Sequence, residues 1–223
     1  MITTSTEDYK TKPSGYFSTP RREMLDFVPL GAKSILEIGC GNGRFGALVK
    51  QRDGCRYTGV ELMEDAAIEA RTRLDEVLTT NIERDALPFE PHSFDGLVCN
   101  DVLEHLVDPW TVLRSLVHHL KPGGFVVVSL PNVRFSEVVK DLVFRKRWTY
   151  TDQGVLDRTH VRFFTEASVR ELLEQAGIVV SRSEGINPIR YAWRLQLLNI
   201  ACFGALSSMR FPQIGAIGRL NNR

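Results

Sequence analysis

Short apolar runs alternate with amphipathic stretches along most of the chain. Four mainly apolar runs, at residues 35–38, 55–61, 93–100 and 125–130, are each followed by turn residues and then by a stretch with helical spacing of its apolar positions. Apolar runs of this length predict buried strands, and the periodic stretches between them predict crossover helices. The pattern therefore predicts an α/β fold around a mainly parallel sheet.

Start and stop signals for helices mark further elements. Asp108 before Pro109 is a strong N-cap signal for a helix over 110–120. Thr165 caps a later helix, and Gly177 stops it. The remaining expected elements are strands at 77–81, 178–183 and 211–220 and helices at 20–28, 44–51, 64–74 and 133–147.

Length and composition limit the number of domains. The chain has 223 residues, of which 43% are apolar and 25% charged, and this is enough for one well-buried core with little left for a second. We expect an N-terminal arm and helix over 1–30 and a single domain over 31–223. Insertions into this domain are expected near 133–164 and 186–210.

Charge and cysteine usage exclude some classes of protein. The net charge of +1 gives no signal for binding DNA, and the four cysteines lack C-x-x-C spacing, which predicts reduced thiols. Residues 1–12 are polar and lack the apolar core of a signal peptide. The stretch 188–209 is interrupted by polar residues and falls short of the roughly 20 apolar residues that a membrane span needs. We expect a cytoplasmic protein without a transmembrane segment.

Three glycines at alternate positions, Gly39, Gly41 and Gly43, directly follow the first strand. Glycine permits a positive φ and lets a ligand approach backbone N–H groups, so this turn is typical of a nucleotide-cofactor site. A dinucleotide fingerprint, G-x-G-x-x-G, is also present and would place Glu61 on the ribose of a dehydrogenase cofactor. Its register argues against it, because counting from Gly39 puts Arg44 where the third glycine is required.

The motif of residues 37–43, E-I-G-C-G-N-G, resembles the first motif of the class I S-adenosylmethionine-dependent methyltransferases. The S-F-D of residues 93–95, the V-L-E-H-L-V-D-P of 102–109 and the L-K-P-G-G of 120–124 resemble further signatures of that family. The resemblance runs in unbroken order over 35–132 and rules against the dehydrogenase interpretation.

A further element, D-R-T-H-V-R-F-F-T at residues 157–165, resembles one in a methyltransferase subgroup that is often associated with methylation of surface glycans and small molecules. The resemblance implies a Rossmann-like, doubly wound sheet of seven strands. Its expected order is 3-2-1-4-5-7-6, with the last strand antiparallel and with helical insertions over the acceptor site.

The resemblance also implies S-adenosylmethionine as the cofactor. Glu61, at the end of the second strand, would accept the ribose hydroxyls, and Asp85 and Ala86 would meet the adenine. The alternatives are a helix cap for Glu61 and a turn role for Asp85. Tyr16 would either close over the cofactor or pack the first helix onto the sheet. The expected cofactor-binding residues are Tyr16, Glu37, Gly39, Gly41, Gly43, Glu61, Leu62, Asp85, Ala86 and Asn100.

Two histidines are the expected catalytic residues. Transfer to an alcohol requires loss of a proton, and His105, just after the fourth strand, is the first candidate for general base. The alternative is that His105 only orients a loop. We expect His105 and His160 to face one acceptor pocket, because the end of the fourth strand and the loop before the capped helix should meet there.

Asp101, Glu104, His105 and His160 also suggest a metal site. They resemble, imperfectly, the E-x-x-E-H and distant histidine by which small-RNA 2′-O-methyltransferases and ubiquinone-pathway O-methyltransferases hold a divalent ion. The first position here is Asp, whose shorter side chain weakens the match. No metal is therefore assigned.

The resulting prediction is O-methylation of a small-molecule or glycan-precursor hydroxyl, in polysaccharide biosynthesis. One alternative is a metal-dependent RNA 2′-O-methyltransferase, which the lack of interleaved basic and aromatic residues outside the tail disfavours. The other is a non-catalytic cofactor-binding module.

Basic residues gather in the segments beyond residue 132, and we predict that they bind an anionic group of the acceptor, as in a nucleotide-linked or lipid-diphosphate-linked sugar. The alternatives are a solvated basic face and a pairing of Arg162 with Asp157. The apolar and basic segment 186–210 is expected to be a helix packed on the sheet, a homodimer face, an acceptor lid that tolerates an anionic or lipid-linked substrate, or a membrane contact. The basic residues are Arg145, Lys146, Arg147, Arg158, Arg162, Arg190 and Arg194.

Overall fold

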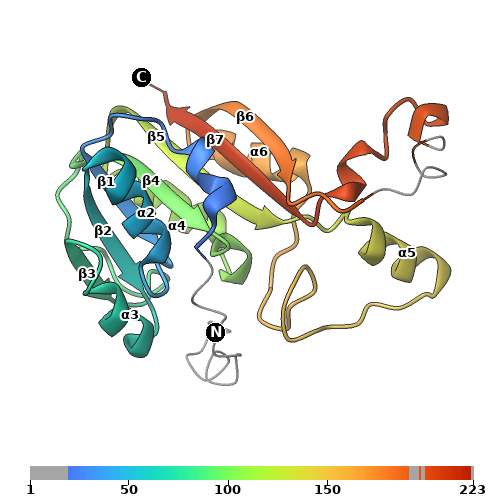
Figure 1. The fold of residues 1–223 in the computed structure, drawn as a ribbon, viewed down its shortest axis with the longest axis horizontal. Coiled ribbons are helices and arrows are strands. Elements are labelled where there is room, and N and C mark those ends of the chain that lie inside the picture. The colour runs from blue at the N-terminus through green and yellow to red at the C-terminus, as the bar shows by residue number, and fades with distance from the viewer. Residues whose placement is uncertain (1–19, 191–195, 197–198, 222–223) are drawn as a thin grey trace.

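The computed structural model describes residues 20–190, 196 and 199–221, and its framework is one seven-stranded sheet (Figure 1). The strand order is β3-β2-β1-β4-β5-β7-β6, and β7 runs antiparallel to both of its neighbours. The predicted fold class and strand order are confirmed. The strands are β1 (Ser34–Ile38), β2 (Arg56–Glu61), β3 (Glu76–Thr79), β4 (Phe94–Asn100), β5 (Leu120–Pro131), β6 (Ile178–Ile186) and β7 (Gln213–Leu220).

Helices follow the strands as the capping signals predict. The Asp108 side chain accepts the N–H of Thr111 at 3.0 Å at the start of α4, and Thr165 and Ser168 form a capping box at the start of α6. The α-helices are α2 (Arg44–Asp53), α3 (Glu64–Ala70), α4 (Pro109–Val117), α5 (Ser136–Phe144) and α6 (Glu166–Gln175), and the 3₁₀ turns are η2 (Arg22–Phe27), η3 (Leu103–His105) and η4 (Ser207–Arg210).

Both faces of the sheet are buried under helices. Successive side chains of a strand point to opposite faces. Leu36 and Leu97 accordingly belong to a core with buried residues of α4 and α6, whereas Ile35 and Val98 belong to a second core with residues of η2 and α2. Figure 1 shows η2 and α2 on the same side of the sheet. Burial on both faces explains why the central strands are nearly continuous apolar runs.

The two halves of the sheet meet between β1 and β4. Both strands are parallel to their neighbours β2 and β5, and the chain leaves β1 for a helix on one face and β4 for a helix on the other. Open α/β sheets form a ligand crevice outside the carboxyl ends of their strands at such a point. The fold therefore directs attention to the residues that follow β1, β2 and β4.

Some predicted boundaries are wrong. The strand expected at 125–130 begins at Leu120, because β5 already pairs with β4 there before an irregularity that precedes Phe125. Gly124 occupies this irregularity, where a Cβ atom would lie 2.9 Å from the carbonyl oxygen of Lys121. Three expected helices, at 20–28, 64–74 and 133–147, are shorter in the structure, and the first of them is the 3₁₀ turn η2. The strand expected at 178–183 is longer and extends to Ile186.

Two segments extend away from the sheet on the same side of the molecule, namely α5 and the residues around 199–210 (Figure 1). Ile200 and Phe203 are exposed, so this part of the segment 186–210 does not pack on the sheet, contrary to one of its expected roles. Among the described residues, no helix has both the length and the apolar character that crossing a membrane requires.

Candidate active site

A cavity of about 860 Å³ lies at the carboxyl ends of β1, β2 and β4. One end is lined by the glycine turn and by residues after β2, and the other by η3 and by the loop that contains His160. The predicted cofactor residues that line it are Glu37, Gly39, Gly41, Glu61, Leu62 and Asn100, and both predicted catalytic histidines line it as well.

The glycine turn brings backbone to the cavity surface. Gly39 has φ +66°, and a Cβ atom there would lie 2.3 Å from a methyl carbon of Val102. Gly41 also has a positive φ and lines the cavity. Gly43 serves packing instead, because a Cβ atom on it would lie 3.1 Å from the Cα of Ala70, and it is not among the residues that line the cavity.

Glu61 is held in place by the backbone. Its carboxylate accepts the N–H groups of Gly41 at 2.8 Å and of Leu62 and Met63 at 2.9 Å each. Burial raises the pKa of Glu61, while these three N–H groups lower it. Each carboxylate oxygen has two lone pairs, so the group keeps acceptor capacity for the hydroxyls of a ligand. The position fits the ribose role predicted for it.

Glu37 lies at the end of β1 and is almost completely buried, and its Oε2 makes no hydrogen bond. Burial raises its pKa from 4.5 to about 8, although the neighbouring Tyr57 and Asn100 act in the opposite direction. The hydroxyl of Tyr57 and the amide of Asn100 make no hydrogen bond among the described residues either. Buried polar groups are normally paired, and Glu37 and Asn100 line the cavity whereas Tyr57 does not, so the unpaired atoms of Glu37 and Asn100 fit a polar or cationic ligand group there.

The predicted adenine contacts are placed differently. Asp85 and Ala86 are exposed and are not among the residues that line the cavity. The Asp85 carboxylate accepts the hydroxyl of Thr80 at 2.7 Å, as expected of a turn residue. Asn81 and Glu83 line the cavity there instead. Tyr16 lies outside the described residues.

Glu104, His105 and His160 converge at the other end of the cavity. The centroids of the two imidazole rings are 4.7 Å apart, with a T-shaped arrangement. One ligand atom from each of the three residues lies within 4.8 Å of the others, and all three residues are buried. The structure therefore brings together two histidines that are far apart in the sequence, as predicted.

Backbone carbonyls orient both rings. His105 Nδ1 lies 3.1 Å from the carbonyl oxygen of Thr159, and His160 Nδ1 lies 3.0 Å from that of Val155. A carbonyl can only accept, so Nδ1 carries the proton in each neutral ring, which makes Nε2 the basic nitrogen. The Glu104 carbonyl in turn accepts the backbone N–H of Val161 at 2.9 Å.

The carboxyl group of Glu104 is completely buried, and its two oxygens make no hydrogen bond. Burial raises its pKa from 4.5 to about 8; a backbone N–H and Arg21 lower it, and Asp157 raises it. Its Oε1 lies 3.9 Å from His160 Nε2, which makes an ion pair only when that imidazole is protonated. Arg21 and a backbone N–H therefore compensate the buried acid only in part, and its carboxyl group faces the histidines.

Asp101 does not join this cluster. It takes a positive φ of 51°, forms an ion pair with Arg21, and accepts hydrogen bonds from Ser129 at 3.1 Å and Gln213 at 3.0 Å. The four-residue metal set considered from the sequence is therefore reduced to the three residues of the cluster.

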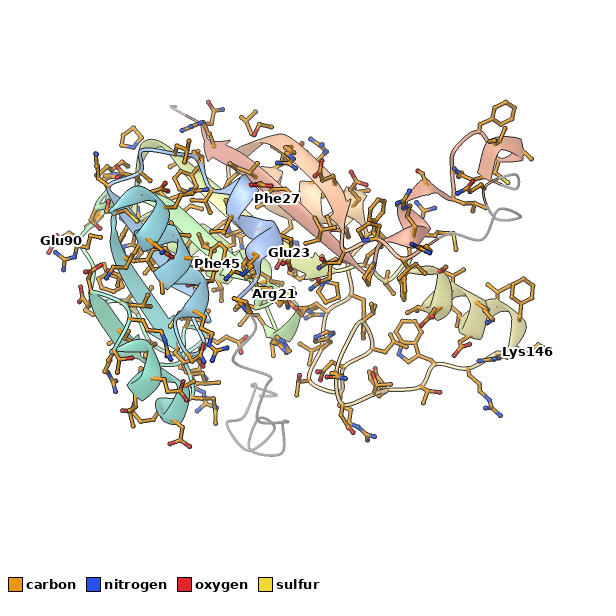
Figure 2. All side chains as sticks on the ribbon, in the orientation of Figure 1. Arg21, Glu23, Phe27, Phe45, Glu90 and Lys146 are labelled. Atoms are coloured by element: carbon orange, nitrogen blue, oxygen red, sulfur yellow. The ribbon has the colours of Figure 1, made fainter. Side chains whose placement is uncertain are left out.

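Arg21 is a residue of the cavity that the sequence did not single out. It reaches the carboxyl end of β4 from the start of η2, and Figure 2 shows it at the centre of the molecule. Its Nη1 donates to Gln213 at 3.1 Å, across 192 positions of the sequence. No local motif announces a contact between such distant residues.

The predicted anion-binding residues do not gather at this cavity. None of those that the structure describes lines it, and Lys146 lies at the far tip beyond α5 (Figure 2). Arg145 pairs with Asp141 at 2.9 Å, and Arg162 donates to the carbonyl of Val107 at 3.0 Å. Arg194 lies outside the described residues.

The charge of the cavity is predominantly acidic. Against the guanidinium groups of Arg21 and Arg44, the cavity wall carries the carboxyl groups of Glu37, Glu61, Glu83, Asp101, Glu104 and Asp157. Because burial raises the pKa of Glu37 and Glu104 to about 8, the other four carboxyl groups carry most of the negative charge near neutral pH, and they still favour a cationic ligand over an anionic one.

Known sequences resemble this chain over most of its length. The family described as a methyltransferase domain matches residues 15–182. A curated relative, the ubiquinone biosynthesis O-methyltransferase of Neisseria meningitidis serogroup C (strain 053442), is 28% identical over 174 residues, which cover 73% of this chain and 72% of the relative.

Solved structures share the fold. A chain in the complex between the Haloferax volcanii Trm112 methyltransferase activator and the putative methyltransferase aligns with a TM-score of 0.66 at 17% identity, covering 97% of this chain and 95% of that chain. A SAM-dependent methyltransferase from Archaeoglobus fulgidus aligns with a TM-score of 0.65 at 18% identity, covering 89% of this chain and 90% of that chain. At these identities the likeness concerns the fold alone.

Proposed function

The chain belongs to the methyltransferase domain family and is an S-adenosylmethionine-dependent enzyme, and from this premise we propose that it methylates a hydroxyl group of a small molecule or glycan precursor. The observation that carries the proposal is the cluster of Glu104, His105 and His160 at one end of the cavity whose other end holds Glu37 and Glu61. One end of the cavity thus suits the cofactor, and the other end suits an acceptor that carries a hydroxyl group.

The cofactor end is suited to a cation with ribose hydroxyls. When bound, S-adenosylmethionine supplies an electrophilic methyl group on a positively charged sulfur. Glu61 would accept the ribose hydroxyls, and the unpaired polar atoms of Glu37 and Asn100 would meet the amino-acid part. Gly39 and Gly41 would present their backbone to the ligand, and a Cβ atom on Gly39 would displace Val102, which also lines the cavity.

The acceptor end is suited to removing a proton. His105 carries its own proton on Nδ1, held by Thr159, so its Nε2 can accept the proton of an acceptor hydroxyl as the new C–O bond forms. His160 is held in the same tautomer and packs edge-on against His105. Fixed rings in a buried site favour transfer by positioning the acceptor.

A metal-assisted version of the same reaction is the second candidate. Glu104, His105 and His160 bring one ligand atom each within 4.8 Å of one another, and each histidine donates its other N–H to a carbonyl, as metal-binding histidines commonly do. A divalent ion there would lower the pKa of the acceptor hydroxyl. Turnover that survives treatment with a chelator would favour the histidine base alone.

The class of acceptor molecule is the part of the proposal that the comparisons narrow least. The curated relative is named for ubiquinone biosynthesis. Phenolic hydroxyls are therefore candidate acceptors, together with the glycan-precursor hydroxyls predicted from the D-R-T-H element. A screen of phenols, carboxylated phenols, nucleotide sugars and short RNA, with release of S-adenosylhomocysteine as readout, separates these classes. Methylation of an amine or of RNA, with no activity on any hydroxylated small molecule, would contradict the proposal.

Contact with a membrane surface is a further part of the proposal, for a lipid-linked acceptor. Helix α5 ends in Leu142, Val143 and Phe144, which are 49%, 58% and 80% exposed, and three basic residues follow at 145–147. Apolar tips flanked by basic residues suit an anionic membrane surface.

Vesicle sedimentation tests the membrane contact. Phe144→Ser should lower retention on vesicles that contain anionic lipid. Val179→Ser is the control and should not change retention, because Val179 is similarly exposed but lies on β6 and not on α5. Equal retention of both variants would remove the membrane from the proposal.

A further inference from the structure

A second, more open depression lies against His160. Its volume is about 520 Å³, and it is lined by Tyr150, Arg158, Val161 and Phe163 together with His160. Because His160 also lines the main cavity, one side chain forms part of the wall of both spaces. A ligand in this depression, which we call the outer depression, would contact the same histidine as an acceptor in the main cavity.

The loop that builds the outer depression is fastened to the catalytic end of the main cavity. Arg158 N donates to the carbonyl of Thr151 at 2.9 Å, which holds Arg158 close to the chain at Tyr150. Val161 N donates to the carbonyl of Glu104 at 2.9 Å. The position of the outer depression is therefore fixed relative to Glu104 and the histidines.

Apolar and aromatic side chains are exposed in the outer depression. Tyr150 is 44% exposed and Val161 42% exposed, and the Phe163 ring is braced by the edge of Trp148 at a centroid distance of 5.1 Å. Clustered exposed side chains of this kind mark binding surfaces more often than isolated ones. Braced aromatic rings offer flat faces on which a ligand ring can stack.

Arg158 gives the outer depression a positive charge. Its ion pair with Asp152 spans 3.0 Å, and both side chains are strongly exposed, so the pair is weak and an incoming anion can replace it. A guanidinium group binds phosphate or carboxylate in a bidentate manner. The wall of the main cavity is acidic by contrast, so an anionic group of an acceptor is better placed outside, next to Arg158.

We propose that the outer depression is an acceptor subsite that binds a ring carrying a phosphate or a carboxylate, while the hydroxyl to be methylated lies in the main cavity. This inference rests on the proposed function. Among the described basic residues that the sequence predicts to bind an anionic group, Arg158 is the one that lines the outer depression.

Binding of three probes to protein saturated with S-adenosylhomocysteine tests the subsite. The probes are uridine diphosphate glucose, a glucosyl diphosphate on a short isoprenyl chain, and 4-hydroxybenzoate, with neutral phenol and glucose for comparison. Arg158→Gln should weaken at least one charged probe about tenfold or more in calorimetry and leave the neutral compounds unchanged. Which probe responds identifies the source of the anionic ring.

Arg56→Gln is the matched control, because Arg56 is as exposed as Arg158, forms an ion pair of the same length, 3.0 Å, with Glu76, and lines neither space. It should bind the probes as the unaltered protein does. The proposal is overturned if Arg158→Gln binds every probe normally, or if the unaltered protein binds none of them.

Tyr150→Ala and Val179→Ala form a second pair, since both side chains are exposed but only Tyr150 lines the outer depression. With an anionic acceptor, Tyr150→Ala should raise KM several-fold at nearly constant kcat, and Val179→Ala should change neither. If Tyr150→Ala only loses binding to anionic vesicles, the surface is a membrane contact and the subsite is wrong.

The two proposals fail in different ways. Probe binding that depends on Arg158 without methylation of any hydroxyl would contradict the proposed function and keep the subsite. Methylation of a hydroxyl with the same KM in Arg158→Gln and in the unaltered protein would keep the function and overturn the subsite.

Discussion

The two ends of the main cavity are built in opposite ways. At the cofactor end, Glu61 is fixed by backbone N–H groups of Gly41, Leu62 and Met63, all within a short stretch of chain after neighbouring strands. At the acceptor end, His105 is fixed by the carbonyl of Thr159, which lies 54 positions further along the chain. One end is assembled locally, and the other depends on how a distant loop folds back.

The buried acids show the same contrast. Burial raises the pKa of both Glu37 and Glu104 to about 8. Glu37 lies beside polar side chains, Tyr57 and Asn100, that lower its pKa in part, whereas Glu104 faces two imidazoles. Under the proposed function, the cofactor end therefore suits a polar or charged ligand group, and the acceptor end suits proton transfer or a metal ion.

Replacing His105, the proposed general base, is the strongest way to separate the two ends. His105→Ala should lower kcat by about 10²–10⁴-fold, the usual contribution of a positioned general base, and leave the affinity for S-adenosylhomocysteine unchanged. Single-turnover methyl transfer and calorimetry measure the two effects. His118→Ala, at an exposed histidine beyond α4, is the control and should change neither. A parallel loss of cofactor affinity in His105→Ala would show that the two ends are not independent.

The buried Glu37 makes the stability of the ligand-free protein depend on pH. Its folded pKa of about 8 lies above the usual 4.5, so the unfolded chain loses its proton first as the pH rises. The resulting stability is present below about pH 4.5 and is lost as the pH rises through 8, by at most ~1.4 kcal/mol per pH unit. Glu37→Gln should show a flatter decrease between pH 5 and 8 in urea unfolding, and Glu171→Gln, on the exposed face of α6, should not. An unchanged slope in Glu37→Gln would refute the assignment.

Removal of the Glu61 carboxylate tests the cofactor end directly. Glu61→Ala deprives three backbone N–H groups of their acceptor and should weaken cofactor binding by about 1.5–3 kcal/mol, the range of hydrogen bonds to charged groups. Calorimetry with S-adenosylmethionine provides the measurement. Glu64→Ala, at an exposed residue at the start of α3, should bind normally, and equal affinities of the two variants would exclude the ribose role.

Two glycines divide binding from packing within the same turn. Gly43→Ala should lower the free energy of unfolding by about 1–2 kcal/mol, because its φ of +78° is strained for alanine and its Cβ would crowd Ala70. Its cofactor affinity should be unchanged, since Gly43 does not line the cavity. Gly39→Ala should lower both quantities. A lower cofactor affinity of Gly43→Ala, measured at a temperature where the variant is folded, would show that Gly43 contributes to cofactor binding.

Much of the fold could be read from the sequence because the relevant signals are local. Alternating apolar strands and amphipathic helices, together with the caps at Asp108 and Thr165, fix the element types, and the structure confirms them. Boundaries were less accurate where pairing between strands decides them, as at Leu120, which joins β5 because it lies opposite Phe94.

Part of the site was equally accessible, for the same reason. Glu37 and Glu61 lie at the carboxyl ends of β1 and β2, and Gly39 directly follows β1. A parallel sheet must bring these strand ends to one edge, so the meeting of the three residues is a consequence of topology. The pairing of His105 with His160 was expected from strand and loop order, and the tautomers of both rings were set by carbonyls that no motif reveals.

Only the tertiary structure decided which charged groups meet. Asp101 follows the D-x-x-E-H spacing, yet its positive φ leaves it paired with Arg21 and apart from the histidines. Among the described basic residues predicted to bind an anion, only Arg158 lines a depression next to His160. Long side chains can point in many directions from one position, so their partners are determined by the distant segments that pack around them.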